Sequence, residues 1–127
     1  AQGANVTAHD ILKTAPRGYT ADHPRIELLR MGGELTWRAG PLAKGSGLCH
    51  GTAGNGYAFL CLYRRTGERV WLERARAFAM HALEQWDAEL REYGRGRFSL
   101  WTGDPGLACF LWDCVRERDA FPTLHVF

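Results

Sequence analysis

Apolar residues recur every three or four positions through much of the chain, a pattern typical of amphipathic helices. The clearest stretch, 69–93, has one apolar stripe made of Trp71, Ala75, Phe78, Ala79, Ala82, Leu83, Trp86 and Leu90. Its other face is charged, and Gly94 marks its end. Residues 55–65 are apolar over most of their circumference, which predicts a helix surrounded by others. A further helix is predicted over 105–116, with Asp104 as its N-cap.

Two helices with a less clear sequence pattern are predicted before these. A helix is predicted over 24–37, although Gly32 and Gly33 in its middle cost about 2 kcal/mol relative to alanine. A short helix is predicted over 4–13, ending before a proline. No segment has the alternation of a strand. The pattern therefore predicts an all-α fold.

An internal repeat organises these helices. The segment L-C-H-G-T-A-G at 48–54 returns as L-W-T-G-D-P-G at 100–106, an offset of 52, and an apolar helix follows each copy. The residues 1–3 fit the tail of a third copy. Because the helix between the copies is amphipathic, the repeat predicts alternating inner and outer helices in two layers. The glycines are expected to form tight turns entering the inner helices.

Composition narrows the class of protein. The chain has 127 residues, a size that suits a single domain, 1–127, and 24% of them are charged. The 16 basic and 14 acidic residues are interleaved, which favours a solvated surface over one that binds nucleic acid. No apolar run is long enough to span a membrane and no secretory signal begins the chain, so four cysteines indicate reduced thiols in the cytoplasm.

The adjacent Cys49 and His50 are the candidate metal ligands. Thiolate and imidazole are usual ligands of zinc. Consecutive helical residues point about 100° apart, so both could face one ion only from an irregular turn, which Gly47 and Gly51 permit. Two ligands make no closed site, however. From the residue types alone, a buried cysteine beside a hydrogen-bonded histidine is the favoured alternative.

The remaining cysteines and histidines suit structural roles better. Apolar helix faces carry Cys61, Cys109 and Cys114, which predicts core packing. His81 is interpreted as a boundary residue of its helix, and terminal or loop-like contexts surround His9, His23 and His125. Asp104 resembles a catalytic acid in type, but capping a helix accounts for it.

Several ordered blocks together resemble one family. The stretch G-L-C-H-G-T-A-G-N-G-Y-A-F-L at 47–60 resembles the signature of lanthionine synthetase C-like proteins. Similar flanking blocks are G-E-L-T-W at 33–37, G-P-L-A-K-G at 40–45, F-S-L-W-T-G at 98–103 and F-P-T-L at 121–124. The resemblance covers 33–127 well and 1–32 poorly. Residues 12–30 are also similar to a segment of an uncharacterised bacterial family, so a junction near Met31 stays an alternative.

The resemblance implies an α/α toroid, with inner helices ringed by outer ones and a zinc ion at its mouth. In that family a Cys-His pair and one further cysteine hold the zinc, and Cys49 and His50 match the pair by position. Coordination deprotonates a substrate thiol. The thiolate then adds to dehydroalanine or dehydrobutyrine, which gives a thioether. The implied substrates are a dehydrated peptide or a glutathione-type thiol.

The sequence also departs from the family. The third ligand belongs to a preceding W-C-x-G-x-x-G block, which would end at residues 1–3, and nothing matches the family's acid and base residues. We therefore expect the C-terminal segment of a toroid that binds zinc weakly or not at all by itself. Its uncovered apolar helix faces are expected to favour self-association. A non-catalytic helical scaffold or binding module that retains the motif is the alternative function.

Overall fold

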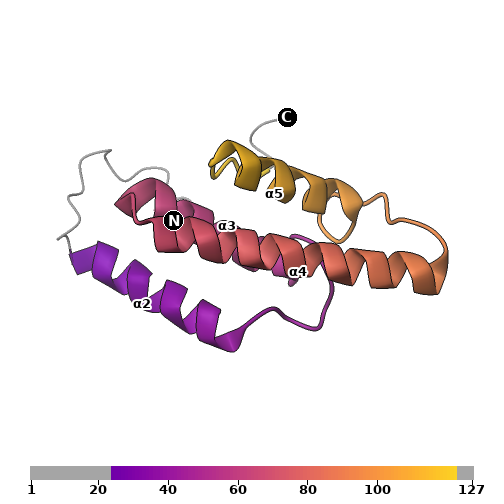
Figure 1. Ribbon diagram of the computed structural model, residues 1–127, viewed down its shortest axis with the longest axis horizontal. Coiled ribbons are helices and arrows are strands. Elements are labelled where there is room, and N and C mark those ends of the chain that lie inside the picture. Colours follow the sequence, from indigo (N-terminus) through magenta and orange to yellow (C-terminus); the bar gives the residue numbers. More distant parts are fainter. Residues whose placement is uncertain (1–23, 123–127) are drawn as a thin grey trace, which may run out of the picture.

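The computed structural model describes residues 24–122, which form four α-helices and no strand (Figure 1). With the labels of Figure 1, the helices are α2 (Pro24–Ala39), α3 (Thr52–Thr66), α4 (Arg69–Tyr93) and α5 (Asp104–Arg116). The predicted all-α class is confirmed for this part of the chain. The helix predicted over 4–13 lies outside the described residues.

Helix α3 is the centre of the fold, because it packs against each of the other three helices. In Figure 1, α2 runs along the lower edge and α5 along the upper edge, with α3 and α4 between them. The core beneath these helices is aromatic and aliphatic, and its largest fully buried side chains include Phe59, Phe78, Phe110, Leu60 and Leu72. This arrangement of a buried helix between less buried ones agrees with the inner and outer layers that the repeat predicts.

Glycines end two of the helices as expected. Gly67 after α3 and Gly94 after α4 are both left-handed, and each donates its N–H to a carbonyl four residues earlier at 2.8 Å. The start of α5 corrects a prediction. Gly103 is the N-cap, while Asp104 is the first helical residue and its carboxylate makes no capping hydrogen bond. The physical reason is that a loop carbonyl, that of Arg97, already accepts the N–H of Asp104 at 2.9 Å.

Helix α2 runs unbroken through its two central glycines. Gly33 is buried, and a methyl group there would overlap the ends of the Leu62 and Trp71 side chains. The helix is further held by Arg74, whose guanidinium donates to both carboxylate oxygens of Glu34 at 2.6 and 3.2 Å. The same guanidinium lies 4.7 Å from the centre of the Trp71 ring. These tertiary contacts offset the low helix propensity of the glycines.

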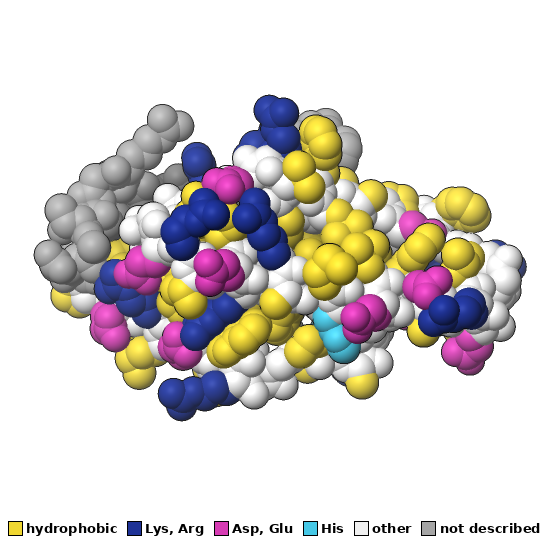
Figure 2. Space-filling model, in the orientation of Figure 1, with side chains coloured by type: hydrophobic (Ala, Val, Ile, Leu, Met, Phe, Trp, Pro, Cys, Tyr) yellow, Lys and Arg dark blue, Asp and Glu magenta, His cyan; other side chains and the backbone are white. Residues whose placement is uncertain are grey.

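The exposed surface is mixed in charge. Figure 2 shows basic and acidic side chains side by side at the left of the molecule, with hydrophobic side chains among them. Among the charged contacts, the carboxylate of Glu117 lies within 3.5 Å of both the Arg69 and the Arg76 guanidinium groups. Within residues 24–122 no helix combines the length and the hydrophobicity needed to cross a bilayer.

A candidate metal-binding turn before helix α3

The glycine-rich segment 45–51, called the Cys-His turn below, caps α3 with its own carbonyl groups. The N–H groups of residues 52, 53 and 54 donate to the carbonyls of residues 45, 46 and 47, at 3.0, 3.3 and 3.4 Å. Gly51 is the N-cap, in an extended conformation, and no side chain caps the helix. The backbone therefore satisfies the first turn of α3, and the side chains of residues 49 and 50 are left exposed.

The turn before α5 is built in the same way. The bond from Asp104 to Arg97 is the counterpart, 52 residues later, of the first bond in the Cys-His turn. Gly103 is extended like Gly51. In the first turn of each following helix, a methyl group on Gly54 or Gly106 would overlap a leucine carbonyl oxygen of the preceding turn. The sequence repeat is therefore also a structural repeat.

One backbone angle distinguishes the two turns. His50 has a left-handed φ of 58°, whereas Thr102, its counterpart in the second repeat, does not have a positive φ. In the described part of the chain, Glu117 is the other non-glycine residue with positive φ. The left-handed residue brings its side chain to that of Cys49, so that Sγ lies 2.8 Å from Nδ1. The irregular turn that the sequence required for a shared ligand position is thus present.

Neighbouring residues hold this turn in place. The N–H of Cys49 donates to the carbonyl oxygen of Trp101 at 2.7 Å, which joins the two repeat turns. On the other side, the fully buried hydroxyl of Thr52 donates to Gln85 Oε1 at 2.6 Å. Gln85 Nε2 donates in turn to the carbonyl of Leu42 at 2.8 Å. Helix α4 therefore anchors both ends of the segment that carries Cys49 and His50.

The pair suits zinc in chemistry and nearly in geometry. Sulfur and imidazole nitrogen ligands at tetrahedral positions on one zinc ion lie about 3.6 Å apart. The Sγ of Cys49 and the Nδ1 of His50 are 2.8 Å apart, so a small increase in this distance would suit zinc. Both side chains are exposed at the surface of the described chain. No group of three or more His, Cys, Asp or Glu residues is placed to hold a metal within residues 24–122. The described chain thus brings together two candidate ligands, Cys49 and His50.

The other cysteines are placed differently. Cys114 is buried in the core, and Cys61 and Cys109 are partly buried on α3 and α5. Burial raises the pKa of the Cys61 thiol, and of the Cys114 thiol, to about 12 in each case. A thiol that keeps its proton is a poor nucleophile and metal ligand. Core packing is confirmed for Cys114 and holds in part for the other two.

The predicted boundary position of His81 agrees with the structure. It is half-buried on α4, with Nδ1 3.7 Å from Glu84 Oε2 and no part in the Cys-His turn. His9, His23 and His125 lie outside the described residues.

Two polar residues that matter to the fold were not foreseen from sequence. One is Gln85, described above. The other is Asp113, a buried carboxylate on α5 that accepts hydrogen bonds from the Tyr57 hydroxyl at 3.0 Å and from Arg118 Nη2 at 3.0 Å. Burial, followed by the charge of Asp113, raises the pKa of Tyr57 well above its usual range. The available signal was an aspartate that follows a run of apolar residues in the second half of α5.

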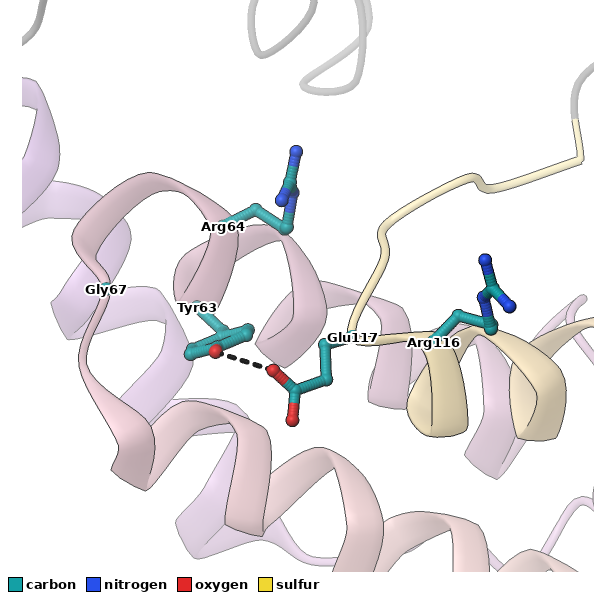
Figure 3. Close-up of a pocket in the computed structure, with 5 residues that line it drawn as sticks. All are labelled: Tyr63, Arg64, Gly67, Arg116 and Glu117. Carbon is teal, nitrogen blue, oxygen red and sulfur yellow. Dashed lines mark hydrogen bonds between the residues drawn. The ribbon is translucent and has the colours of Figure 1, made fainter.

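A hollow of about 380 Å³ lies at the opposite end of α3 (Figure 3). Its lining residues are Tyr63, Arg64, Gly67, Arg116 and Glu117. Figure 3 shows the Tyr63 hydroxyl pointing at Glu117, to which it donates at 2.9 Å. That hydrogen bond, with the charges of Arg69 and Arg76, lowers the pKa of Glu117. The carboxylate is therefore used in holding α3, α4 and α5 together.

Comparison with known proteins identifies the family of this chain. The family model of lanthionine synthetase C-like proteins matches residues 3–126. LanC-like protein GCL1 of Arabidopsis thaliana is 43% identical over 99 residues, which cover 74% of this chain and 22% of the relative. Glutathione S-transferase LANCL1 of Danio rerio is 40% identical over 99 residues, which cover 74% of this chain and 23% of that relative.

No solved structure matches the chain. The chain spans about a fifth of the length of the curated relatives that it matches. The family match includes both repeat turns, of which the Cys-His turn is the first, and all four described helices. This chain belongs to the lanthionine synthetase C-like family.

Proposed function

We propose that Cys49 and His50 are two of the protein ligands of a zinc ion that activates a thiol for thioether formation. The observation that carries this proposal is the left-handed His50, which gathers a thiol and an imidazole at an exposed turn. The equivalent turn of the second repeat has Trp101 and Thr102 in place of the cysteine and the histidine, and Thr102 does not have a positive φ. The same fold element is therefore specialised in one copy of the repeat, and family membership supports thiol chemistry as the reason.

The reaction proposed is addition of a thiol to dehydroalanine or dehydrobutyrine. When bound, zinc lowers the pKa of a coordinated thiol, so a thiolate is present at neutral pH. The sulfur bonds to the β-carbon, the electron pair of the C=C bond moves to the α-carbon, and that carbon takes up a proton. The Danio rerio relative is named as a glutathione S-transferase, which supports glutathione as the thiol. The family description supports a cysteine of a dehydrated peptide as well.

This chain's own contribution is the placement of two ligands. The Trp101 carbonyl and the Gln85 side chain fix the turn from two sides, so that little freedom remains to be lost when a metal binds. The outward side of the pair stays open to a substrate thiol. All four cysteines are free, which suits a reducing, cytoplasmic location.

The complete activity is proposed for a longer polypeptide. The chain spans about a fifth of its curated relatives, and no third ligand joins Cys49 and His50 within the described residues. Catalytic zinc sites use three protein ligands and one exchangeable position. By itself the chain is expected to bind zinc weakly and to lack cyclase activity. Because only two candidate ligands are present, a helical scaffold or binding module is the second candidate function.

Zinc titration followed by calorimetry tests the proposal. The chain, prepared without chelator, is compared with Cys49→Ala and His50→Ala, and with Cys61→Ala as the matched control. We expect weak, substoichiometric binding that both site variants abolish and the control keeps. Stoichiometric, tight zinc lost in Cys49→Ala would reveal a third ligand and contradict the two-ligand site. Zinc binding that Cys49→Ala leaves unchanged would contradict a ligand role and favour the scaffold.

A further inference from the structure

The two repeat turns lie directly against each other, and Leu48 makes the side-chain part of their contact. Leu48 precedes Cys49 in the Cys-His turn and is buried in the hydrophobic core. A methyl group built on Gly106, in the first turn of α5, would lie 2.8 Å from Leu48 Cγ and 3.0 Å from Leu48 Cδ1. The Leu48 side chain therefore rests on the backbone of α5 at Gly106, where any larger residue would displace it.

This contact joins the two copies of the repeat rather than two parts of one copy. Leu100, the counterpart of Leu48, also lies against Gly106, but through its carbonyl oxygen. At Gly54, the counterpart of Gly106, the three atoms nearest to an added methyl group all belong to the backbone of Leu48. Each glycine thus receives the backbone of its own turn, and Gly106 receives a side chain of the other turn as well. Through Leu48, the first copy of the repeat is therefore packed on the second.

The backbone on both sides of Leu48 is fixed by the same second turn. On the N-terminal side, a methyl group on Gly47 would lie 3.0 Å from the Trp101 carbonyl oxygen, so the two turns are in close contact there. On the C-terminal side, the Cys49 N–H donates to that same carbonyl oxygen at 2.7 Å. A shift of Leu48 on α5 would therefore move the backbone of Cys49, and of the left-handed His50 after it, relative to the second turn.

We propose that Leu48 is a positioning residue for the Cys-His pair, a role that rests on the function proposed above. Packed on Gly106, Leu48 makes the second repeat fix where the side chains of Cys49 and His50 stand. Its own side chain is apolar and cannot bind a metal, so its effect reaches the metal through the backbone of the turn. Residues that orient metal ligands in this indirect way contribute about 10- to 100-fold to metal affinity.

Hydrogen exchange of the metal-free chain, followed by NMR, tests the hold of Leu48 on the turn. Leu48→Ala empties the contact on Gly106. Leu72→Ala is the matched control, because Leu72 is a fully buried leucine in the first turn of α4, at the end of α3 away from the Cys-His turn. Relative to amides in the middle of α4, the Cys49 N–H should exchange about tenfold or more faster in Leu48→Ala and unchanged in Leu72→Ala. Leu48→Met should restore the slow exchange.

Gly47→Ala provides a second test that creates no cavity. Its methyl group would press on the Trp101 carbonyl oxygen at 3.0 Å and push the two turns apart, whereas the methyl group of Gly32→Ala meets no atom within 4 Å. We expect faster exchange of the Cys49 N–H in Gly47→Ala and no change in Gly32→Ala. This pair decides the result even where Leu48→Ala fails to fold.

Cobalt(II) titration of the same variants tests the effect on the metal. Binding is followed by the charge-transfer absorption of the Cys49 thiolate, and it should be about tenfold or more weaker in Leu48→Ala than in Leu72→Ala. Equal changes in these two variants, in exchange or in affinity, would overturn the proposal, because Leu48 would then act only through overall stability. A wild-type chain that binds no cobalt would contradict the proposed zinc function instead, while selectively faster exchange in Leu48→Ala would still support the hold of Leu48 on the turn.

Discussion

At the scale of single residues, Gln85 is the side chain that ties the Cys-His turn to α4. It accepts from a fully buried Thr52 hydroxyl and donates to the Leu42 carbonyl. Gln85→Ala leaves both groups unpaired, and we expect the free energy of unfolding to fall by about 1–3 kcal/mol. Urea unfolding measures it, with Glu84→Ala as the exposed neighbouring control. The double variant with Thr52→Val should recover part of the loss. Equal midpoints for Gln85→Ala and its control would contradict this role.

Glu68 makes the stability of the α2 contact depend on pH. Its carboxylate accepts from Arg30 Nε at 3.1 Å and from Trp71 Nε1 at 2.8 Å. These hydrogen bonds, the one from Arg30 first, hold the pKa of Glu68 below its ordinary value of 4.5. A lowered folded-state pKa gives stability that is present above pH 4.5 and is lost as the pH falls through the folded-state value.

Thermal unfolding from neutral to acidic pH checks this expectation. The Glu68→Gln chain should be less stable than wild type at neutral pH and should lose less stability on acidification. Parallel curves for the two chains would show that the Glu68 carboxylate does not carry the effect.

The sequence pattern identified the candidate ligands but not the residues, such as Gln85, that fix the position of the Cys-His turn. Cys49 and His50 stand out because they are adjacent, of metal-binding type and set among glycines. Gln85 lies on α4 among charged neighbours, and its partners are 33 and 43 positions away in sequence. Asp113 likewise pairs with Tyr57 across 56 positions. Polar contacts between helices leave no periodic signal, so only the packed structure reveals them.

At the scale of helices, periodicity predicted more than capping did. The stretch 69–93 has the same bounds in sequence and structure, since a long apolar stripe and a terminal glycine define it. Helix α3 begins at residue 52 rather than 55, and Gly103 replaces Asp104 as N-cap of α5. Both differences have one cause, because carbonyls of the preceding turn satisfy the first N–H groups of these helices. A side-chain rule for caps cannot detect a backbone cap.

The adjacent glycines of α2 should respond oppositely to the same substitution. At Gly32 a methyl group meets nothing, so Gly32→Ala should stabilise the monomer by about 0.5–1 kcal/mol through helix propensity. At Gly33 it would overlap Leu62 and the rigid Trp71 ring, so Gly33→Ala should destabilise by about 1–3 kcal/mol. Urea unfolding at low protein concentration compares the two. Equal effects of the same sign would contradict the packing of α2 against α3 and α4.

At the scale of the whole molecule, the described chain is a section of alternating inner and outer helices. Helix α3 presents the Cys-His turn at its N-terminal end, and the second repeat turn supports it from the side through Trp101. The chain spans about a fifth of the curated relatives. The sequence repeat predicted this layering, and its period of 52 residues is also the spacing of the equivalent hydrogen bonds.

X-ray absorption at the zinc edge, with the protein in excess over zinc, tests the central claim most directly. The account predicts one sulfur and one imidazole from the protein around zinc, with lighter ligands completing the shell. Glutathione should then add a second sulfur at about 2.3 Å, and Cys49→Ala should remove the first. A shell with no sulfur, or one that glutathione leaves unchanged, would contradict the claim that Cys49 and His50 form an open, thiol-accepting zinc site.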